Sequence, residues 1–321
     1  MRFQQGVDTL AQQKVLDPIS QTIQDLVKGI YRSGGVAGRQ VGNAMYGTWL
    51  GHPFHPSTTD VVVGSWTGGF VLDVLNAVTG SGLFARCADA AVAIGTLGAL
   101  AAVPSGLTDF QHPSGEARRV GLVHGLLNIG GTLLQMLSLL QRARGERGSA
   151  RTLSSMAFGG LLVSAYLGGD IIDKYQVGVN RAAGETVPAD FVAVMREADL
   201  PQERLHQVDV NGSPVLLVRR GDRIYAMHAT CTHMGGPLAQ GTIAGDAVQC
   251  PWHGSRFAFD DGHVIGGPAS YPERCLATRV RNGMIEVGPG AGLGRCRHEP
   301  VSTRQAQAEA ERQMAVAPAL R

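Results

Sequence analysis

Two short clusters of cysteine and histidine carry the clearest chemistry in the sequence. Cys231 and His233 stand two residues apart, and after 16 further residues Cys250 and His253 follow three residues apart. Thiolate and imidazole are ligands that suit zinc or an iron–sulfur cluster. Glycine and proline around both clusters let the two loops turn back tightly and leave backbone N–H groups able to face cluster sulfurs. The spacing therefore predicts a metal centre with four ligands from two loops.

The segments around these residues predict the elements that hold the loops. Residues with period-two alternation are separated by turn signals such as Asn211-Gly212 and Asn282-Gly283, a pattern typical of an antiparallel sandwich or barrel. The predicted strands cover 205–210, 215–219, 224–227, 247–249, 256–259, 277–281 and 284–287.

This part of the chain resembles a Rieske [2Fe–2S] domain over residues 190–287. The resemblance rests on CTHMGGPL at 231–238, on CPWHGSRF at 250–257 and on GGPA at 266–269, which is similar to the proline loop that closes over the cluster in that family.

The resemblance implies a ligand set and a cofactor. Cys231 and Cys250 would bind one iron of a [2Fe–2S] cluster, and His233 and His253 would bind the other. The alternatives are a structural zinc site and a ligand set that binds no metal.

Departures from two branches of the family narrow the expected function. High-potential respiratory members carry two more cysteines and a tyrosine near the cluster, where this chain has Gly236, Trp252 and Phe257. Fewer hydrogen bonds to the cluster favour a potential toward the low end of the roughly −150 to +300 mV range. Rieske oxygenases also need an iron site with two histidines and a carboxylate. Because His298 is the sole histidine after residue 287, the sequence predicts that the protein is not a Rieske oxygenase.

Four long apolar segments precede the β domain and predict membrane-spanning helices. They cover about 60–78, 88–107, 120–140 and 152–172, and crossing a bilayer takes ~20 mostly apolar residues. The short connections require antiparallel neighbours, so both termini lie on one side of the membrane. The expected fold is a membrane bundle of four α-helices followed by an all-β Rieske domain, with the lipid bilayer as a partner. A net charge of +2 over 321 residues argues against nucleic acid as a partner.

The predicted domain organisation has five parts. An amphipathic helix is expected over 19–31, packed on the membrane domain or lying in the membrane interface. The parts are an N-terminal amphipathic segment (1–50), a transmembrane domain (51–175), a linker (176–188), the Rieske domain (189–288) and a flexible tail (289–321).

The membrane half resembles a family of bacterial four-helix membrane domains of unknown function, some of which are fused to Rieske domains. The resemblance covers 47–181 and rests on GTWLGHPFHP at 47–56 and on Asp73, Arg119, His124 and Asn128.

Four polar residues in and beside the predicted spans are candidates for a second site. Ionisable residues inside a membrane are costly and mark functional sites, and residues four apart share a helix face. His52, His55, His124 and Asn128 could form a site for haem b or for a quinone. The alternative is that they only join helices through hydrogen bonds.

These observations predict a membrane-anchored iron–sulfur protein that passes single electrons between a soluble donor and a membrane acceptor, quinone or haem. The alternatives are a redox sensor coupled to the membrane domain and a structural zinc module on a membrane scaffold. Because iron–sulfur clusters are normally assembled in the cytosol, we expect the Rieske domain and both termini to face the cytoplasm at the cell membrane. The arginines and lysines on the two sides are nearly balanced, so charge does not decide the orientation.

Overall fold

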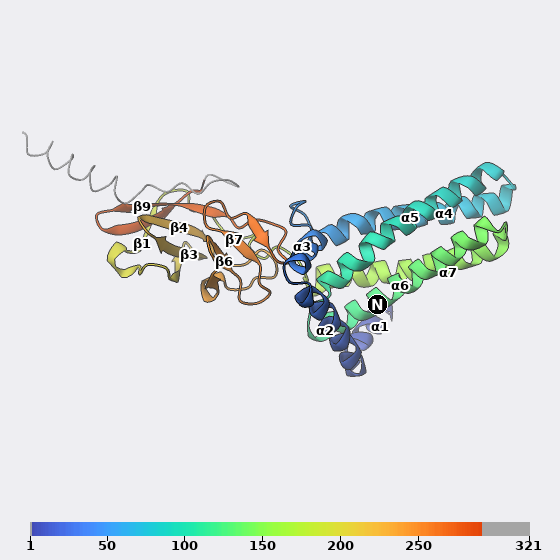
Figure 1. Cartoon of the computed structure of the whole chain (residues 1–321), viewed down its shortest axis with the longest axis horizontal. Helices are drawn as coiled ribbons and strands as arrows, with labels where there is room; N and C mark the ends of the chain where they lie inside the picture. Colours follow the sequence, from blue (N-terminus) through green and yellow to red (C-terminus); the bar gives the residue numbers. More distant parts are fainter. Residues whose placement is uncertain (1, 291–321) are drawn as a thin grey trace, which may run out of the picture. The chain divides into compact units, whose positions relative to one another are not determined.

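The chain folds into two units, one helical and one built of β-strands. The computed structural model describes residues 2–290, and the boundary between the units lies between Val179 and Asn180 (Figure 1). The predicted flexible tail, 289–321, lies almost wholly outside the described residues.

Four long helices form the body of the first unit, and each is long and apolar enough to cross a membrane. The four predicted spans are thus confirmed as helices, which extend beyond the apolar segments because polar residues continue them at both ends. The helices are α4 (Phe54–Thr79), α5 (Gly82–Asp109), α6 (Gly115–Ala143) and α7 (Arg147–Gly169), and α7 continues into a π-helical turn, Asp170–Lys174.

The four helices form a bundle in which α4 and α6 lie diagonally opposite. Helix α5 packs on α4 and α6, and α7 packs on α6 and α4 (Figure 1). Glycine permits the close approach of α4 and α5, because a Cβ on Gly95 would lie 2.3 Å from the ring of Trp66. The buried centre contains Val62, Trp66, Ala99, Ala102 and Leu161, whereas the outward-facing positions carry exposed leucine, valine and isoleucine. An apolar exterior of this kind suits contact with lipid tails.

Three shorter helices precede the bundle. Asp17 pairs with Arg118 and Arg119 at 3.0 and 2.9 Å, so polar contacts attach the second of these helices to the start of α6. The same helix contains the predicted segment 19–31, and Leu26 and Ile30 on it are exposed. The three helices are α1 (Arg2–Ala11), α2 (Asp17–Ser33) and α3 (Gly35–Tyr46).

The second unit contains two antiparallel sheets, as the turn signals predicted. One sheet has the order β1-β10-β9-β4-β3-β2 and the other has the order β5-β6-β7-β8. The larger sheet consists of β1 (Val192–Arg196), β2 (Leu205–Val210), β3 (Ser213–Arg220), β4 (Arg223–His228), β9 (Cys275–Arg281) and β10 (Met284–Gly288). The smaller sheet consists of β5 (Thr242–Ile243), β6 (Ala247–Gln249), β7 (Arg256–Ala258) and β8 (Val264–Gly266). The predicted strands are all present, and β1, β5 and β8 are additional.

Two hydrophobic clusters fill the β unit, and one of them supports the cysteine and histidine loops. This cluster includes Leu216, Met227, Leu238, Phe257 and Phe259, and the two cysteines of the loops, Cys231 and Cys250, belong to it as well. The two loops therefore pack on side chains from both sheets.

Candidate metal centre

Two loops with the same backbone pattern present the cysteines. The N–H of Cys231 donates to the carbonyl of Gly236 at 2.8 Å, and the N–H of Gly235 donates back to the carbonyl of Cys231 at 2.8 Å. The second loop repeats this arrangement around Cys250, with Ser255 and Gly254 in the equivalent roles at 2.8 and 3.1 Å.

Each loop requires a glycine four residues after its cysteine. Gly235 and Gly254 have φ of +82° and +78°, a conformation that glycine adopts without the steric cost that a Cβ brings. The glycines noted in the sequence thus close the two loops.

The four candidate ligands come together as two pairs. Cys231 and Cys250 are 1% and 3% exposed, and the Cys231 thiol donates a hydrogen bond to the sulfur of Cys250. The rings of His233 and His253 lie 5.1 Å apart between centroids, at an angle of 85°. Among residues 2–290, no three His, Cys, Asp or Glu side chains converge on a single ion position. The four residues therefore stand as one thiol pair and one imidazole pair, which is the arrangement that gives each iron of a two-iron cluster two ligands.

The protonation states suit metal binding. Burial, with His253 as the second cause, lowers the pKa of His233 to about 3, so the ring is neutral at pH 7 and keeps a lone pair. The hydrogen bond from Cys231 lowers the pKa of Cys250 to about 6 and raises the pKa of Cys231. Cys250 is therefore the thiol of the pair that ionises more readily, and both thiols must lose their protons to bind a metal.

A third loop supports the other two. The N–H of Ala269 donates to Oγ of the fully buried Ser255 at 3.1 Å. A Cβ on Gly267 would lie 2.6 Å from Cα of Ser255, so this loop lies directly on the second cysteine loop. Buried Glu273 accepts the N–H of Thr232 at 2.7 Å, which fixes the first loop. The sequence marked the third loop but gave no sign of Glu273, because a lone glutamate before a strand carries no distinctive spacing.

The structure brings together three of the four membrane candidates. His55 lies in the first turn of α4 and His124 in α6, with ring centroids 6.4 Å apart. Asn128 donates to Nε2 of His124 at 3.1 Å. His52 stands apart: it is exposed, precedes α4, and bonds the carbonyl of Pro53 at 3.1 Å.

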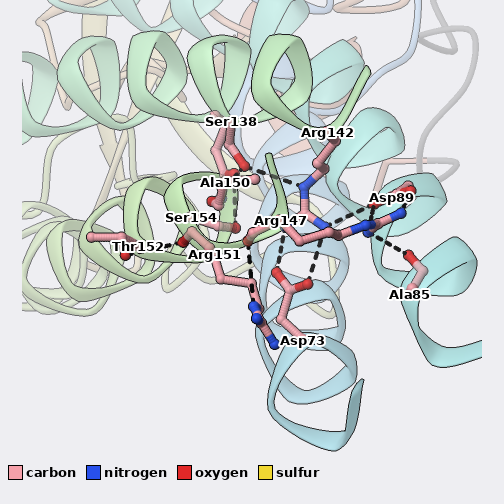
Figure 2. Close-up of polar contacts among 12 residues, drawn as sticks. Asp73, Ala85, Asp89, Ser138, Arg142, Arg147, Ala150, Arg151, Thr152 and Ser154 are labelled. Carbon is pink, nitrogen blue, oxygen red and sulfur yellow. Dashed lines mark hydrogen bonds and ion pairs between the residues drawn. The ribbon is translucent and has the colours of Figure 1, made fainter. Parts of the chain in front are cut away.

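A second polar cluster, buried at Asp73 and Arg142 and partly exposed at Asp89 and Arg147, joins all four long helices at the opposite end of the bundle (Figure 2). Arg142 of α6 binds both carboxylate oxygens of Asp73 on α4 and reaches Asp89 of α5 at 2.8 Å. Arg147 at the start of α7 binds Asp89 through two hydrogen bonds of 2.6 and 2.5 Å. Asp73 was marked by the resemblance, whereas the other three were missed. Opposite charges at matching depth in neighbouring spans were the signal that could have revealed them.

Comparison with known proteins finds one family match in the β unit and one in the helical unit. The family described as "Rieske [2Fe-2S] domain" matches residues 190–282, and the family described as "Predicted membrane protein (DUF2231)" matches residues 51–181. Ferredoxin CarAc of Metapseudomonas resinovorans is 31% identical over 98 residues, which are 30% of this chain and 92% of that ferredoxin.

The chain belongs to the Rieske [2Fe–2S] family.

Two further relatives fall in the same part of the chain. The Rieske domain is 31% identical over 96 residues to the cytochrome b6-f complex iron-sulfur subunit of Chlorobaculum tepidum, covering 30% of this chain and 52% of that subunit. Among solved structures, the ferredoxin of carbazole 1,9a-dioxygenase from Nocardioides aromaticivorans IC177 is 29% identical, with a TM-score of 0.30, and covers 32% of this chain and 99% of that one.

Family membership determines the cofactor and the general role. The Rieske domain carries a [2Fe–2S] cluster and transfers electrons, and it follows a multi-pass membrane domain of the DUF2231 family. The predicted fold, the cluster and the membrane location are confirmed at this level.

Proposed function

We propose that the protein is a membrane-anchored one-electron carrier that connects a soluble donor with an acceptor in the membrane, a quinone or a haem. The observation that carries the proposal is the pairing of two thiols and two imidazoles in matched loops of a domain fused to four spanning helices.

Each ligand pair has its own role in this proposal. Cys231 and Cys250 hold one iron, and His233 and His253 hold the other. The cluster supplies one-electron chemistry when bound. The chain contributes the buried thiol pair, the neutral imidazole of His233, and backbone loops that keep the ligands in place without rearrangement.

The soluble donor is proposed to dock at the face that contains Trp252. This side chain is 56% exposed and its ring lies 6.4 Å from that of His253. An exposed aromatic side chain next to a cluster ligand suits a transient redox interface, since aromatic residues are enriched in the centres of interfaces. Trp252→Ala is expected to slow reduction by a soluble ferredoxin reductase without changing the cluster spectrum.

The Rieske domain and both termini are proposed to face the cytoplasm, because that is where clusters are assembled. The test is to label single cysteines introduced at Gly212 and Gly145 with a membrane-impermeant thiol reagent in intact cells. Cys296 and the exposed Cys87 must first be replaced by serine. Labelling at 145 and not at 212 is expected, and the reverse pattern contradicts this orientation.

Electron transfer to the membrane is tested in liposomes containing the full chain. The cluster is reduced with dithionite, excess reductant is removed, and the visible absorbance is followed after adding a lipid-soluble quinone or, separately, haem. Re-oxidation with at least one of these acceptors, and not in liposomes without them, is expected. A cluster that stays reduced with both contradicts a membrane acceptor of this kind.

A further inference from the structure

Two histidines meet on the axis of the membrane bundle. His55 and His124 come from α4 and α6, the two helices that lie diagonally opposite. Their rings are 6.4 Å apart between centroids and nearly perpendicular, at 83°. Both are partly buried, and both lie inside membrane-spanning helices.

Glycines on the other two helices make room for both rings. A Cβ on Gly106 of α5 would lie 2.7 Å from Cε1 of His55, and a Cβ on Gly168 of α7 would lie 3.2 Å from Cε1 of His124. All four helices therefore contribute to one layer of the bundle, with an imidazole facing a glycine on each side.

Hydrogen bonds to backbone carbonyls fix the tautomer of each ring. Nδ1 of His55 lies 2.8 Å from the carbonyl oxygen of Ala102, and Nδ1 of His124 lies 2.9 Å from that of Ser164. A carbonyl can only accept, so each Nδ1 carries the hydrogen and each Nε2 carries a lone pair. This second hydrogen bond to a backbone carbonyl is the arrangement that orients metal-binding histidines.

The side-chain amide of Asn128 donates a hydrogen bond to one of these lone pairs. Its Nδ2 donates to Nε2 of His124 at 3.1 Å and to the carbonyl of His124 at 3.0 Å. Within residues 2–290, His55 makes its hydrogen bonds through Nδ1 alone, to Ala102 and, at 3.4 Å, to Ser105. The lone pair of His124 thus has Asn128 as its donor, whereas that of His55 accepts no hydrogen bond from the described residues; His124 binds a metal through Nε2 once Asn128 turns away.

We propose that His55 and His124 are two ligands of a transition-metal centre on the axis of the bundle. Two imidazoles that bind one metal in a linear arrangement place their ring centres about 6 Å apart, because each metal–nitrogen bond is about 2.0–2.1 Å. The observed 6.4 Å matches this spacing. Imidazole ligands suit iron, copper, zinc and nickel.

The number of ligating side chains indicates which kind of metal centre the two histidines could hold. No third His, Cys, Asp or Glu of residues 2–290 joins the two histidines in a common set. Two neutral ligands leave the charge of a bare ion uncompensated in a medium of low dielectric constant, which is costly. A haem brings four more nitrogens and its own negative charge. The same two-imidazole chemistry is thus open to haem iron or to a free ion, and the test separates them.

The metal site goes beyond the proposed function and rests on its own geometry. As an acceptor for the cluster electron, it would depend on the proposed function. As a metal site, it is measured by metal content and spectrum, so that either idea can fail alone.

The test uses the full chain, purified in detergent from cells supplied with iron and a haem precursor and, separately, with copper, nickel or zinc. Haem is measured by its pyridine haemochrome spectrum, and metals by plasma mass spectrometry, after subtracting the two irons of the cluster. The wild-type chain is expected to hold one further metal per chain. His55→Leu and His124→Leu are expected to reduce it by more than roughly tenfold while keeping the cluster signal.

His52→Ala is the matched control, because His52 lies in the same HPFHP segment but outside the layer. It should retain the metal. Should a leucine variant fail to insert, His55→Gln and His124→Gln keep a polar side chain and lack the imidazole nitrogen. Haem lost in the variants identifies haem iron, and another metal lost identifies a free ion. A wild-type chain with no metal beyond the cluster irons in any preparation, or variants that retain it, overturns the proposal and leaves a packed histidine pair.

Discussion

Cys231 and Cys250 occupy equivalent positions in two backbone loops of the same design. Each cysteine N–H donates to the carbonyl five residues later, and each cysteine carbonyl accepts the N–H of the glycine four residues later. The thiols meet between the loops, where the Cys231 thiol donates to Cys250. Each loop thus supplies one thiol to the pair.

Removing one proposed ligand should abolish the cluster. Cys231→Ser and His253→Ala are expected to lose the visible absorption and the reduced-state electron paramagnetic resonance signal completely, because neither loop contains a spare Cys or His. His263→Ala is the control, since His263 is exposed and bonded to Asp261. A normal cluster spectrum in either ligand variant would show that the assignment is wrong.

A hydroxyl at residue 257 should raise the midpoint potential. Phe257 is fully buried in the hydrophobic cluster that contains Cys231 and Cys250. In Phe257→Tyr, a hydrogen bond to a ligand sulfur stabilises the more negative reduced form. A difference of about 1 kcal/mol between oxidation states corresponds to a rise of about 40 mV for one electron.

The control for this prediction is Phe259→Tyr, which adds the same hydroxyl two residues along in the same cluster. It should leave the potential unchanged. Redox titration of both variants provides the measurement, and equal potentials in Phe257→Tyr and the wild type would show that residue 257 does not reach the cluster ligands.

The ion pairs of Arg142 and Arg147 with Asp73 and Asp89 should stabilise the folded helical bundle. The Arg142 side chain is 3% exposed and is the partner of both Asp73 and Asp89. Arg142→Met removes the partner of a buried carboxylate, which typically costs about 3–5 kcal/mol. Unfolding in detergent, followed by circular dichroism, should show this loss.

Two further variants test whether the loss of stability comes from these ion pairs. Arg144→Met changes an exposed arginine two residues away and should have little effect. Adding Asp73→Leu to Arg142→Met should recover part of the stability, because Asp89 keeps Arg147 as its partner. If Arg142→Met is as stable as Arg144→Met, the network does not hold the helices together.

The parts predictable from the sequence were those set by local spacing. The Cys and His clusters, the turn signals and the apolar spans each depend on neighbouring residues, so they appeared before the fold was known. Strand β1 (Val192–Arg196) was missed because its apolar run lacks alternation, and its pairing with β10 is long-range.

Packing decided what the sequence did not reveal. Helix α3 contains three glycines, which disfavour helices when taken by themselves. Packing on α2 requires one of them, because a Cβ on Gly38 would lie 2.1 Å from the carbonyl oxygen of Tyr31. The pairing of Asp73 with Arg142 joins residues 69 apart in sequence and depends on the depth of each helix. The pairing of His124 with His55 rather than His52 likewise depends on where α4 begins.

The attachment of α2 to the bundle should depend on pH. The hydrogen bonds from Arg119, and then from Arg118, lower the pKa of Asp17 from 3.8 to about 2. A depressed carboxyl pKa stabilises the folded state above pH 3.8, and this contribution is lost as the pH falls through about 2. As the pH falls from 3.8 to about 2, the exchange rate of the α2 amides, divided by the rate of an unfolded chain at the same pH, should therefore rise.

Asp17→Asn should show faster exchange in α2 at neutral pH and little further change across the window. Asp25→Asn is the control, because Asp25 is exposed on the same helix. If Asp17→Asn retains the wild-type pH dependence, another group controls the attachment.

A redox titration of the purified full chain, followed by electron paramagnetic resonance, measures whether the four residues hold a one-electron iron–sulfur cluster. We expect a coloured protein with two cluster irons whose signal appears on reduction along a one-electron curve and is absent in Cys231→Ser. A colourless, signal-free chain that holds one zinc ion at these four residues would contradict it.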